Sequence, residues 1–176
     1  MNVQIRPAKP TDLSALTLLA RQTYVDAYGQ DMTAEALARQ LAGPLSPGQV
    51  AHMFERDVFL LAEHEGRLVG FVQFGVTRPE YRSDDGTVHA AVGDMELRRL
   101  YVLARQQGRG LGGRLMLAAL HHSRLAGRRV FLTVWHTNVA AQRFYARHHF
   151  RQIGVFPLPV VAGGFDLLLF RDIRQP

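Results

Sequence analysis

The chain has 176 residues, 47% of them hydrophobic and 20% charged, which is typical of one soluble globular domain with a substantial core. The absence of cysteine excludes disulfides, a thiol nucleophile and a thiolate metal site. The net charge is +6, but Lys9 is the only lysine and the arginines are scattered, which favours a small acidic ligand over a nucleic acid. No signal-peptide core or membrane-spanning run is visible. We therefore expect a single cytoplasmic domain over residues 1–176.

The first part of the chain predicts a strand followed by helices. Residues 3–6 alternate apolar and polar side chains, as in a short strand. Thr11 or Asp12 can cap a helix that continues to about Ala27, and Thr33 begins a second helix. Residues 46–54 predict a further short helical segment.

The next segment predicts three strands. Residues 57–63 and 68–76 are rich in β-branched and aromatic side chains, and their short connection indicates a hairpin. Residues 78–86 form a polar loop, long enough to serve as a functional lip. Residues 95–102 complete a meander.

A glycine-rich turn follows that third strand and opens a helix. Residues 107–113 contain four glycines, and apolar spacing from Leu111 continues the helix to about Leu125, before Gly127. Inward N–H groups of such a turn, together with the helix dipole, favour phosphate. Arg109 and Arg114 could add charge there, although solvation at the surface is an equally good interpretation.

The last part of the chain alternates strands and helices. Residues 130–135 predict a buried strand, parallel to residues 95–102 across the intervening helix. Asn138 can cap a last helix. Residues 150–154 and 165–170 predict two final strands with a proline-rich loop between them. The whole order indicates an α/β (α+β) domain with a mixed sheet and helices on both faces.

Two motifs resemble those of the GNAT family of acetyl-CoA-dependent N-acetyltransferases. Residues 107–112 read Gln-Gly-Arg-Gly-Leu-Gly, which resembles the family pattern Q/R-x-x-G-x-G/A after a strand and before a helix. Residues 138–145 resemble its second motif, N-x-x-A-x-x-F-Y. The resemblance implies a mostly antiparallel sheet of about seven strands, with a V-shaped split between strands 4 and 5. A β-bulge in residues 100–103 would open that split.

The resemblance also implies which residues hold acetyl-CoA as a co-substrate. The glycine-rich turn would grip the pyrophosphate, main-chain groups near Leu100 and Val102 would pair with pantetheine, and the N–H near Val102 would polarise the thioester carbonyl. Asn138, which is also a helix cap, would contact pantetheine. The full set of coenzyme-binding candidates is Leu100, Tyr101, Val102, Gln107, Gly108, Arg109, Gly110, Leu111, Gly112, Gly113, Asn138 and Ala141.

Two catalytic roles follow from the same resemblance. Glu96 matches the general base of some family members, with a surface glutamate paired to Arg98 or Arg99 as the alternative and Asp94 as a weaker candidate. Tyr145 matches the tyrosine that protonates the leaving thiolate, with core packing of its ring as the alternative. His149 stands where relatives carry glycine, which places the end of that helix in question.

The acceptor is left open by the sequence. The pattern is similar to the bacterial polyamine and diamine branch of the family, whose acceptor is a primary amine attracted by acidic residues; Glu96, Asp84, Asp85 and Asp166 would be the candidates. The basic net charge argues against a polycation. Alternatives are a peptide or protein N-terminal acetyltransferase and a non-catalytic acyl-CoA-binding module.

Other side chains fit structural roles better. Tyr24, Tyr28 and Phe74 could line an acceptor pocket, but core packing is the better interpretation. His136 could touch substrate, and a surface position is the better interpretation. We expect no metal, no specific nucleic acid and no membrane partner, and relatives suggest a homodimer.

Overall fold

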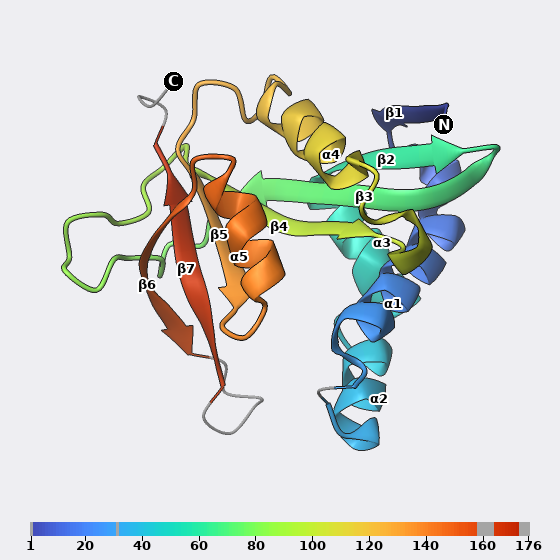
Figure 1. Ribbon diagram of the computed structural model, residues 1–176, viewed down its shortest axis with the longest axis horizontal. Coiled ribbons are helices and arrows are strands. Elements are labelled where there is room, and N and C mark those ends of the chain that lie inside the picture. The colour runs from blue at the N-terminus through green and yellow to red at the C-terminus, as the bar shows by residue number, and fades with distance from the viewer. Residues whose placement is uncertain (1, 31, 158–163, 173–176) are drawn as a thin grey trace. The chain divides into compact units, whose positions relative to one another are not determined.

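The computed structural model describes residues 2–30, 32–157 and 164–172 (Figure 1). The proline-rich loop expected before the last strand lies largely outside these residues. The strands form one seven-stranded sheet in the order β1-β2-β3-β4-β5-β7-β6. The chain divides into two compact units, residues 1–74 with 99–121 (unit 1) and residues 75–98 with 122–176 (unit 2). The expectation of a single domain stays a prediction.

The elements follow the predicted order, including the short third helix. Two short 3-10 turns, Pro10–Asp12 and Ala104–Gln106, precede α1 and the glycine-rich turn. In chain order the described elements are β1 (Val3–Pro7), α1 (Leu13–Tyr28), α2 (Ala34–Ala42), α3 (Pro47–Arg56), β2 (Val58–His64), β3 (Arg67–Val76), β4 (Met95–Val102), α4 (Leu111–Leu120), β5 (Val130–Trp135), α5 (Val139–Ala146), β6 (Arg151–Pro157) and β7 (Phe165–Arg171).

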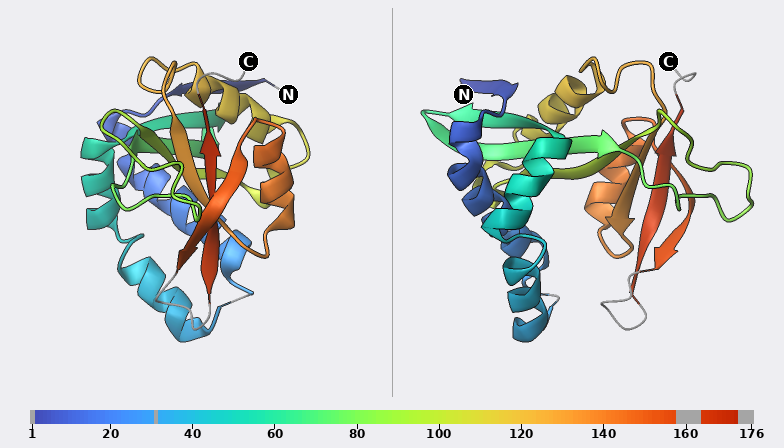
Figure 2. Two further views of the ribbon diagram at one scale, coloured as in Figure 1. Left: turned by 90° about the vertical axis from the view of Figure 1, so that its left-hand side faces the viewer. Right: turned by 180° about the vertical axis from the view of Figure 1, so that it is seen from behind.

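Unit 1 places helices on both faces of strands β1 to β3. Helices α1 and α3 lie on one face and α4 lies on the other (Figure 2, right). Strand β4 and helix α4 both approach β3 closely at Gly70. A Cβ added there would lie 2.9 Å from the Tyr101 carbonyl oxygen and 3.3 Å from a methyl group of Leu115 on α4. Phe74 is fully buried, as core packing requires. Tyr24 and Tyr28 are half-buried and pack on each other, with ring centroids 4.9 Å apart.

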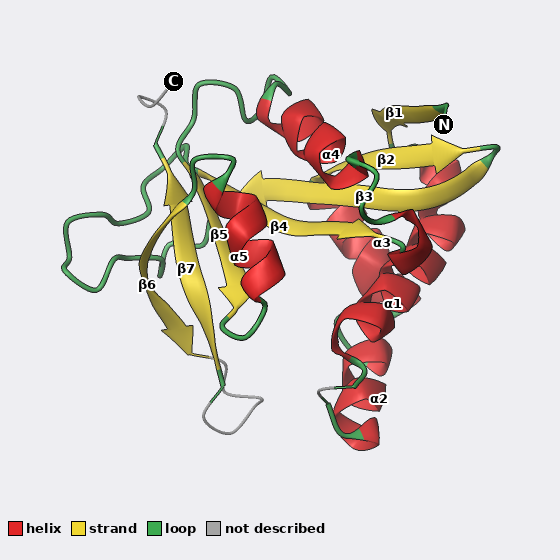
Figure 3. Ribbon diagram, viewed as in Figure 1, coloured by secondary structure: helices red, strands yellow, loops and turns green. Residues whose placement is uncertain are grey.

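Unit 2 covers one face of its strands with a loop and the other with α5 (Figure 2, left). The loop is residues 77–94, between β3 and β4 (green in Figure 3). Its Tyr81 is fully buried and packs with Phe131, Leu168 and Phe170. The segment predicted as a polar lip therefore supplies a core side chain, because an aromatic ring inserted between strands removes a large apolar area from water.

The predicted cap at Thr33 and the hairpin turn are confirmed, and Ser46 adds a second cap. Thr33 accepts a hydrogen bond from the N–H of Ala36 at 3.2 Å, and Ser46 accepts from Gln49 at 3.4 Å. The β2–β3 hairpin turns at Glu65 and Gly66, both with positive φ (50° and 73°), the combination that a type I′ turn requires.

Two local predictions are wrong. Asp12 stands at the N-cap of α1, but its carboxylate accepts from Arg6 and from the Lys9 N–H instead of capping the helix. Helix α4 ends at Leu120 rather than near Leu125. There the His122 ring accepts from the Arg124 N–H at 3.2 Å, a side chain to backbone bond that competes with helix continuation.

Candidate active site

The glycine-rich turn has the geometry of an anion-binding site. Gly108 and Gly110 have φ of 73° and 75°, and Gly110 is the N-cap of α4. Residues 107–110 are exposed, and no protein atom lies within 4 Å of a Cβ built on Gly108 or Gly110. The turn therefore leaves room for a ligand to approach the main chain at the positive end of a helix dipole. A pyrophosphate fits this arrangement.

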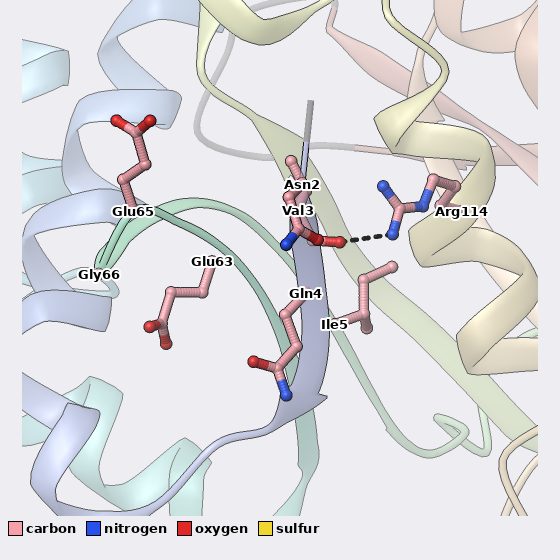
Figure 4. A pocket seen from close by; sticks show the side chains of 8 residues that line it. All are labelled: Asn2, Val3, Gln4, Ile5, Glu63, Glu65, Gly66 and Arg114. Carbon is pink, nitrogen blue, oxygen red and sulfur yellow. Dashed lines mark hydrogen bonds between the residues drawn. The ribbon is translucent and has the colours of Figure 1, made fainter.

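Side chains on either side of the turn bind the protein itself. The Gln107 amide donates to the Val102 carbonyl oxygen at 3.1 Å, so it fixes the turn against the end of β4. Arg114, a candidate for phosphate, donates to the Val3 carbonyl oxygen at 2.6 Å (Figure 4). That bond joins α4 to β1 at the edge of a shallow pocket. The structure therefore gives Arg114 a packing role.

The second motif forms the start of α5, in unit 2. Asn138 is the N-cap, and its side-chain oxygen accepts from the Ala141 N–H at 3.0 Å. Gln142, which sequence reasoning missed, donates to the His136 carbonyl oxygen at 2.8 Å and ties the helix to the end of β5. Tyr145 is 9% exposed, with its ring against Phe150 at a centroid distance of 5.9 Å. Its ring thus packs in the core.

Glu96 is a buried carboxylate, not a surface one. It is 2% exposed and accepts from the Tyr81 hydroxyl at 2.9 Å and from Arg98 at 2.6 Å. The Nε atom of Arg78 lies 3.4 Å from the same carboxylate. Burial, together with the Glu96 charge, raises the pKa of Tyr81, so that hydroxyl stays a donor. The predicted pairing with Arg98 is present, but the predicted surface position is wrong.

Asp94, the weaker candidate for a base, has a structural role. It is 6% exposed and accepts from Arg129 Nε at 2.9 Å and from the Ala91 N–H at 2.8 Å. The adjacent register joins Met95 to Val130, the first parallel pair of β4 and β5. The ion pair therefore fixes the point where the two strands meet.

The other acidic candidates also have partners within the protein. Asp84 accepts from the Val155 N–H at 3.3 Å. The Ser83 hydroxyl and the Thr87 N–H hold the pKa of Asp85 at about 2, as in a turn that a side chain closes. Burial raises the pKa of Asp166, to which the Thr133 hydroxyl donates. Each of these carboxylates therefore has a hydrogen-bonding role within the protein.

The histidines and remaining features add no metal site to this picture. The ring of His136 stacks on Phe165 at 4.2 Å, and its Nδ1 lies 3.0 Å from the Phe165 carbonyl oxygen, so it is half-buried rather than on the surface. Across the described ranges, no three His, Asp or Glu side chains group as metal ligands. Among the helices described, none is long and apolar enough to cross a membrane.

A model of the acetyltransferase (GNAT) family matches residues 18–150, most of the chain. The match covers the glycine-rich turn and the Asn138 motif, which lie in the predicted positions after β4 and β5. The chain therefore belongs to the GNAT family and is an acyltransferase. The observed sheet, with β4 and β5 parallel and the other neighbouring strands mostly antiparallel, is the fold that the motifs predicted.

Curated relatives carry acetyltransferase names. An uncharacterized N-acetyltransferase of Mycobacterium tuberculosis (strain ATCC 25618 / H37Rv) is 32% identical over 144 residues, 80% of this chain and 84% of the relative. The spermine/spermidine N(1)-acetyltransferase of Bacillus subtilis (strain 168) is 33% identical over 90 residues, half of this chain. This match spans only 55% of the Bacillus enzyme's own length.

Solved structures share the fold at low identity. The PaiA N-acetyltransferase of Thermoplasma acidophilum, solved in complex with coenzyme A, has a TM-score of 0.74 at 19% identity, covering 98% of this chain and 99% of that one. An N-acetyltransferase of Staphylococcus aureus Mu50 has a TM-score of 0.69 at 21% identity, covering 99% and 100%. At these identities the likeness shows the fold alone.

Proposed function

We propose that this protein transfers the acetyl group of acetyl-CoA to a primary amine. The observation that carries the proposal is the glycine-rich turn, where Gly108 and Gly110 adopt positive φ and leave open space at the N-terminus of α4. That geometry fits the pyrophosphate of coenzyme A, because the main-chain N–H groups can reach phosphate oxygens where a Cβ would intervene. Coenzyme A bound to the Thermoplasma relative is consistent with this assignment.

Each unit contributes its own coenzyme contacts in this proposal. In unit 1, residues 107–113 bind the pyrophosphate and the main chain of residues 100–102 pairs with pantetheine. The Val102 N–H stabilises the oxyanion that develops on the thioester carbonyl. In unit 2, Asn138 and Ala141 contact pantetheine at the start of α5. The bulge and the split between β4 and β5 remain predictions.

Two side chains handle the protons in the proposed reaction. Tyr145 donates its phenolic proton to the leaving thiolate. Glu96 accepts a proton from the acceptor ammonium, directly or through water. A Glu96→Gln variant that keeps full kcat and its pH profile would assign the role to water.

The acceptor attacks the acetyl group directly in a ternary complex. With no cysteine in the chain, a thiol acyl-enzyme is excluded. Mixing the protein with acetyl-CoA and a panel of primary amines, while titrating free thiol, tests the proposal. We expect thiol release that depends on one class of amine. Coenzyme binding by calorimetry without thiol release from any amine would contradict the proposal. Thiol release only with the terminal amine of a peptide would also contradict it.

We also propose that the protein acts in the cytoplasm as a homodimer. Sedimentation velocity at micromolar concentration tests the oligomeric state. A single species with the 19.7 kDa mass of one chain would contradict the dimer.

A further inference from the structure

One face of the unit 2 strands carries a row of half-buried side chains. The register pairs Trp135 of β5 with Asp166 of β7, and Asp166 with Phe156 of β6. Directly paired residues of antiparallel strands point to the same face, so these three lie side by side. Tyr81 packs on this same face, because it contacts Phe131 and Phe156. The row is thus two apolar rings flanking one carboxyl group.

The Arg78 guanidinium lies over this face. Its central carbon is 5.6 Å from the centroid of the Tyr81 ring and 5.9 Å from that of Phe156. Its Nε is 3.4 Å from Glu96, and its side chain is 45% exposed. Within the part of the chain that the structure describes, neither Nη atom makes a hydrogen bond. Two aromatic rings and a carboxylate therefore fix a guanidinium whose outer edge faces solvent.

The carboxylates near Arg78 have other hydrogen-bond partners. Glu96 is already paired with Arg98 at 2.6 Å, and Asp166 accepts from Thr133. Burial raises the pKa of Asp166. In formal charge, Glu96 and Asp166 balance Arg98 and Arg78. The Glu96 carboxylate is engaged by Arg98 and Tyr81, so the outer edge of the Arg78 guanidinium can take a further anionic partner.

We propose that the acceptor carries a carboxylate that binds the outer edge of Arg78, and an apolar group that rests on Phe156 and Trp135. A guanidinium presents two parallel N–H groups that match a carboxylate, whereas a polyamine would meet like charge there. The acceptor class is therefore an amino carboxylate with an apolar or aromatic side chain. The inference rests on the proposed acetyltransferase function for its turnover arm only.

Trp135, the single tryptophan, gives a binding signal that needs no turnover. N-acetyl-L-phenylalanine and its amide differ only in the carboxylate, so titrating each against Trp135 fluorescence isolates that group. We expect the acid to bind about tenfold or more tightly than the amide, the factor of a charge-assisted hydrogen bond. Arg78→Gln should reduce this ratio to about twofold or less, while Arg82→Gln, the same change on the same loop, should keep it. Equal affinities for acid and amide would overturn the proposal.

Turnover separates this inference from the proposed function. With acetyl-CoA, we expect phenylalanine to release thiol about tenfold faster, in kcat/KM, than phenylalaninamide or spermidine, and Arg78→Lys to retain part of the preference. Rapid turnover of spermidine with no preference for the acid would sustain the acetyltransferase function and overturn the carboxylate site. No thiol release from any amine, with the binding preference intact, would overturn the function and sustain the site.

Discussion

At the scale of single residues, the side chains around Glu96 determine what its carboxylate can do. Tyr81 donates a hydrogen bond to the carboxylate at 2.9 Å and Arg98 donates another at 2.6 Å. A carboxylate in this environment orients its neighbours as well as accepting protons. Tyr81 therefore helps to hold the carboxylate proposed as the base, although only Glu96 was a candidate from the sequence.

The proposed acid role of Tyr145 makes a prediction about turnover. Tyr145→Phe keeps the ring that packs on Phe150 and removes only the hydroxyl. We expect kcat to fall by about a hundredfold, the usual contribution of a general acid, with the dissociation constant of coenzyme A unchanged within about twofold. Steady-state kinetics and calorimetry check both values. Tyr28→Phe is the control, and an unchanged kcat in Tyr145→Phe would remove the acid role.

Asp12 makes a prediction about stability and pH. Its hydrogen bond from Arg6 holds its pKa at about 2, below the ordinary value of 3.8. Because the folded pKa is the lower one, the stabilisation is complete above pH 3.8 and is lost as the pH falls through 2. Asp12→Asn should lower the free energy of unfolding at pH 7 by about 1–2 kcal/mol.

Chemical denaturation at pH 7 and at pH 2 checks the Asp12 prediction. The difference between Asp12→Asn and the parent protein should shrink at pH 2. Glu35→Gln is the control, since Glu35 pairs with Arg39 on an exposed helix surface and should contribute less than about 0.5 kcal/mol. A deficit of the same size at both pH values would show that the ion pair is not its cause.

At the scale of elements, the glycine-rich turn joins β4 to α4 and depends on its backbone conformation. Gly110→Val should weaken coenzyme A binding by at least a hundredfold, because a branched side chain strains φ at 75° and fills the open space. Isothermal titration checks this. Gly66→Val is the matched control, since Gly66 has φ of 73° and equally open surroundings at the β2–β3 turn. Equal losses of binding in both variants would point to general strain rather than to a phosphate site.

The residue that follows the end of α5 has a strained backbone conformation, and a glycine at that position would relieve the strain. His149 adopts φ of 65°, and the Phe150 N–H returns to the Tyr145 carbonyl oxygen at 3.2 Å, closing the helix. The cap geometry that the sequence placed in question is therefore kept without glycine. A left-handed conformation costs a non-glycine residue about 1–2 kcal/mol, partly offset by the chain entropy that glycine adds. His149→Gly should raise the free energy of unfolding by about 0.5–1 kcal/mol, as measured by urea denaturation. A loss of stability would contradict this account.

Local signals explain which elements were predictable. The caps at Thr33 and Asn138 accept from N–H groups three residues away, so sequence alone identified them. The glycine-rich turn is equally local, since its conformation is set by its own glycines. Helix α4 was misjudged at its end because the apolar spacing continues to Leu125, while the His122 ring bonds the backbone instead.

Long-range partners explain what was not predictable. The partner of Arg114 is the Val3 carbonyl, 111 residues away, and that of Glu96 is Tyr81, in a loop that looked polar. An aromatic residue alone in a charged loop was the only signal for Tyr81. Pairings of this kind follow from the tertiary fold, and no spacing in the chain encodes them.

At the scale of the whole molecule, the chain crosses between its two units within β3, within β4 and again just after α4. Unit 1 carries the turn proposed for the coenzyme's pyrophosphate, and unit 2 carries Glu96, Tyr145 and the Arg78 cluster. The turn proposed for the pyrophosphate and the side chains proposed for the reaction thus lie in separate parts of the chain. The net charge of +6 suits acidic ligands in both, a pyrophosphate in one and a carboxylate in the other.

Direct transfer of the acetyl group to an amine is the central claim, and isotopic labelling tests it. The protein is mixed with acetyl-CoA labelled with ¹³C in the acetyl group, with and without the amine that triggers thiol release. The masses of the protein, the amine and the coenzyme are then measured by mass spectrometry. We predict one labelled acetyl group on the amine for each thiol released, and an unchanged protein mass when the amine is omitted. A labelled protein that passes its acetyl group to the amine, or thiol released with an unmodified amine, would contradict the account.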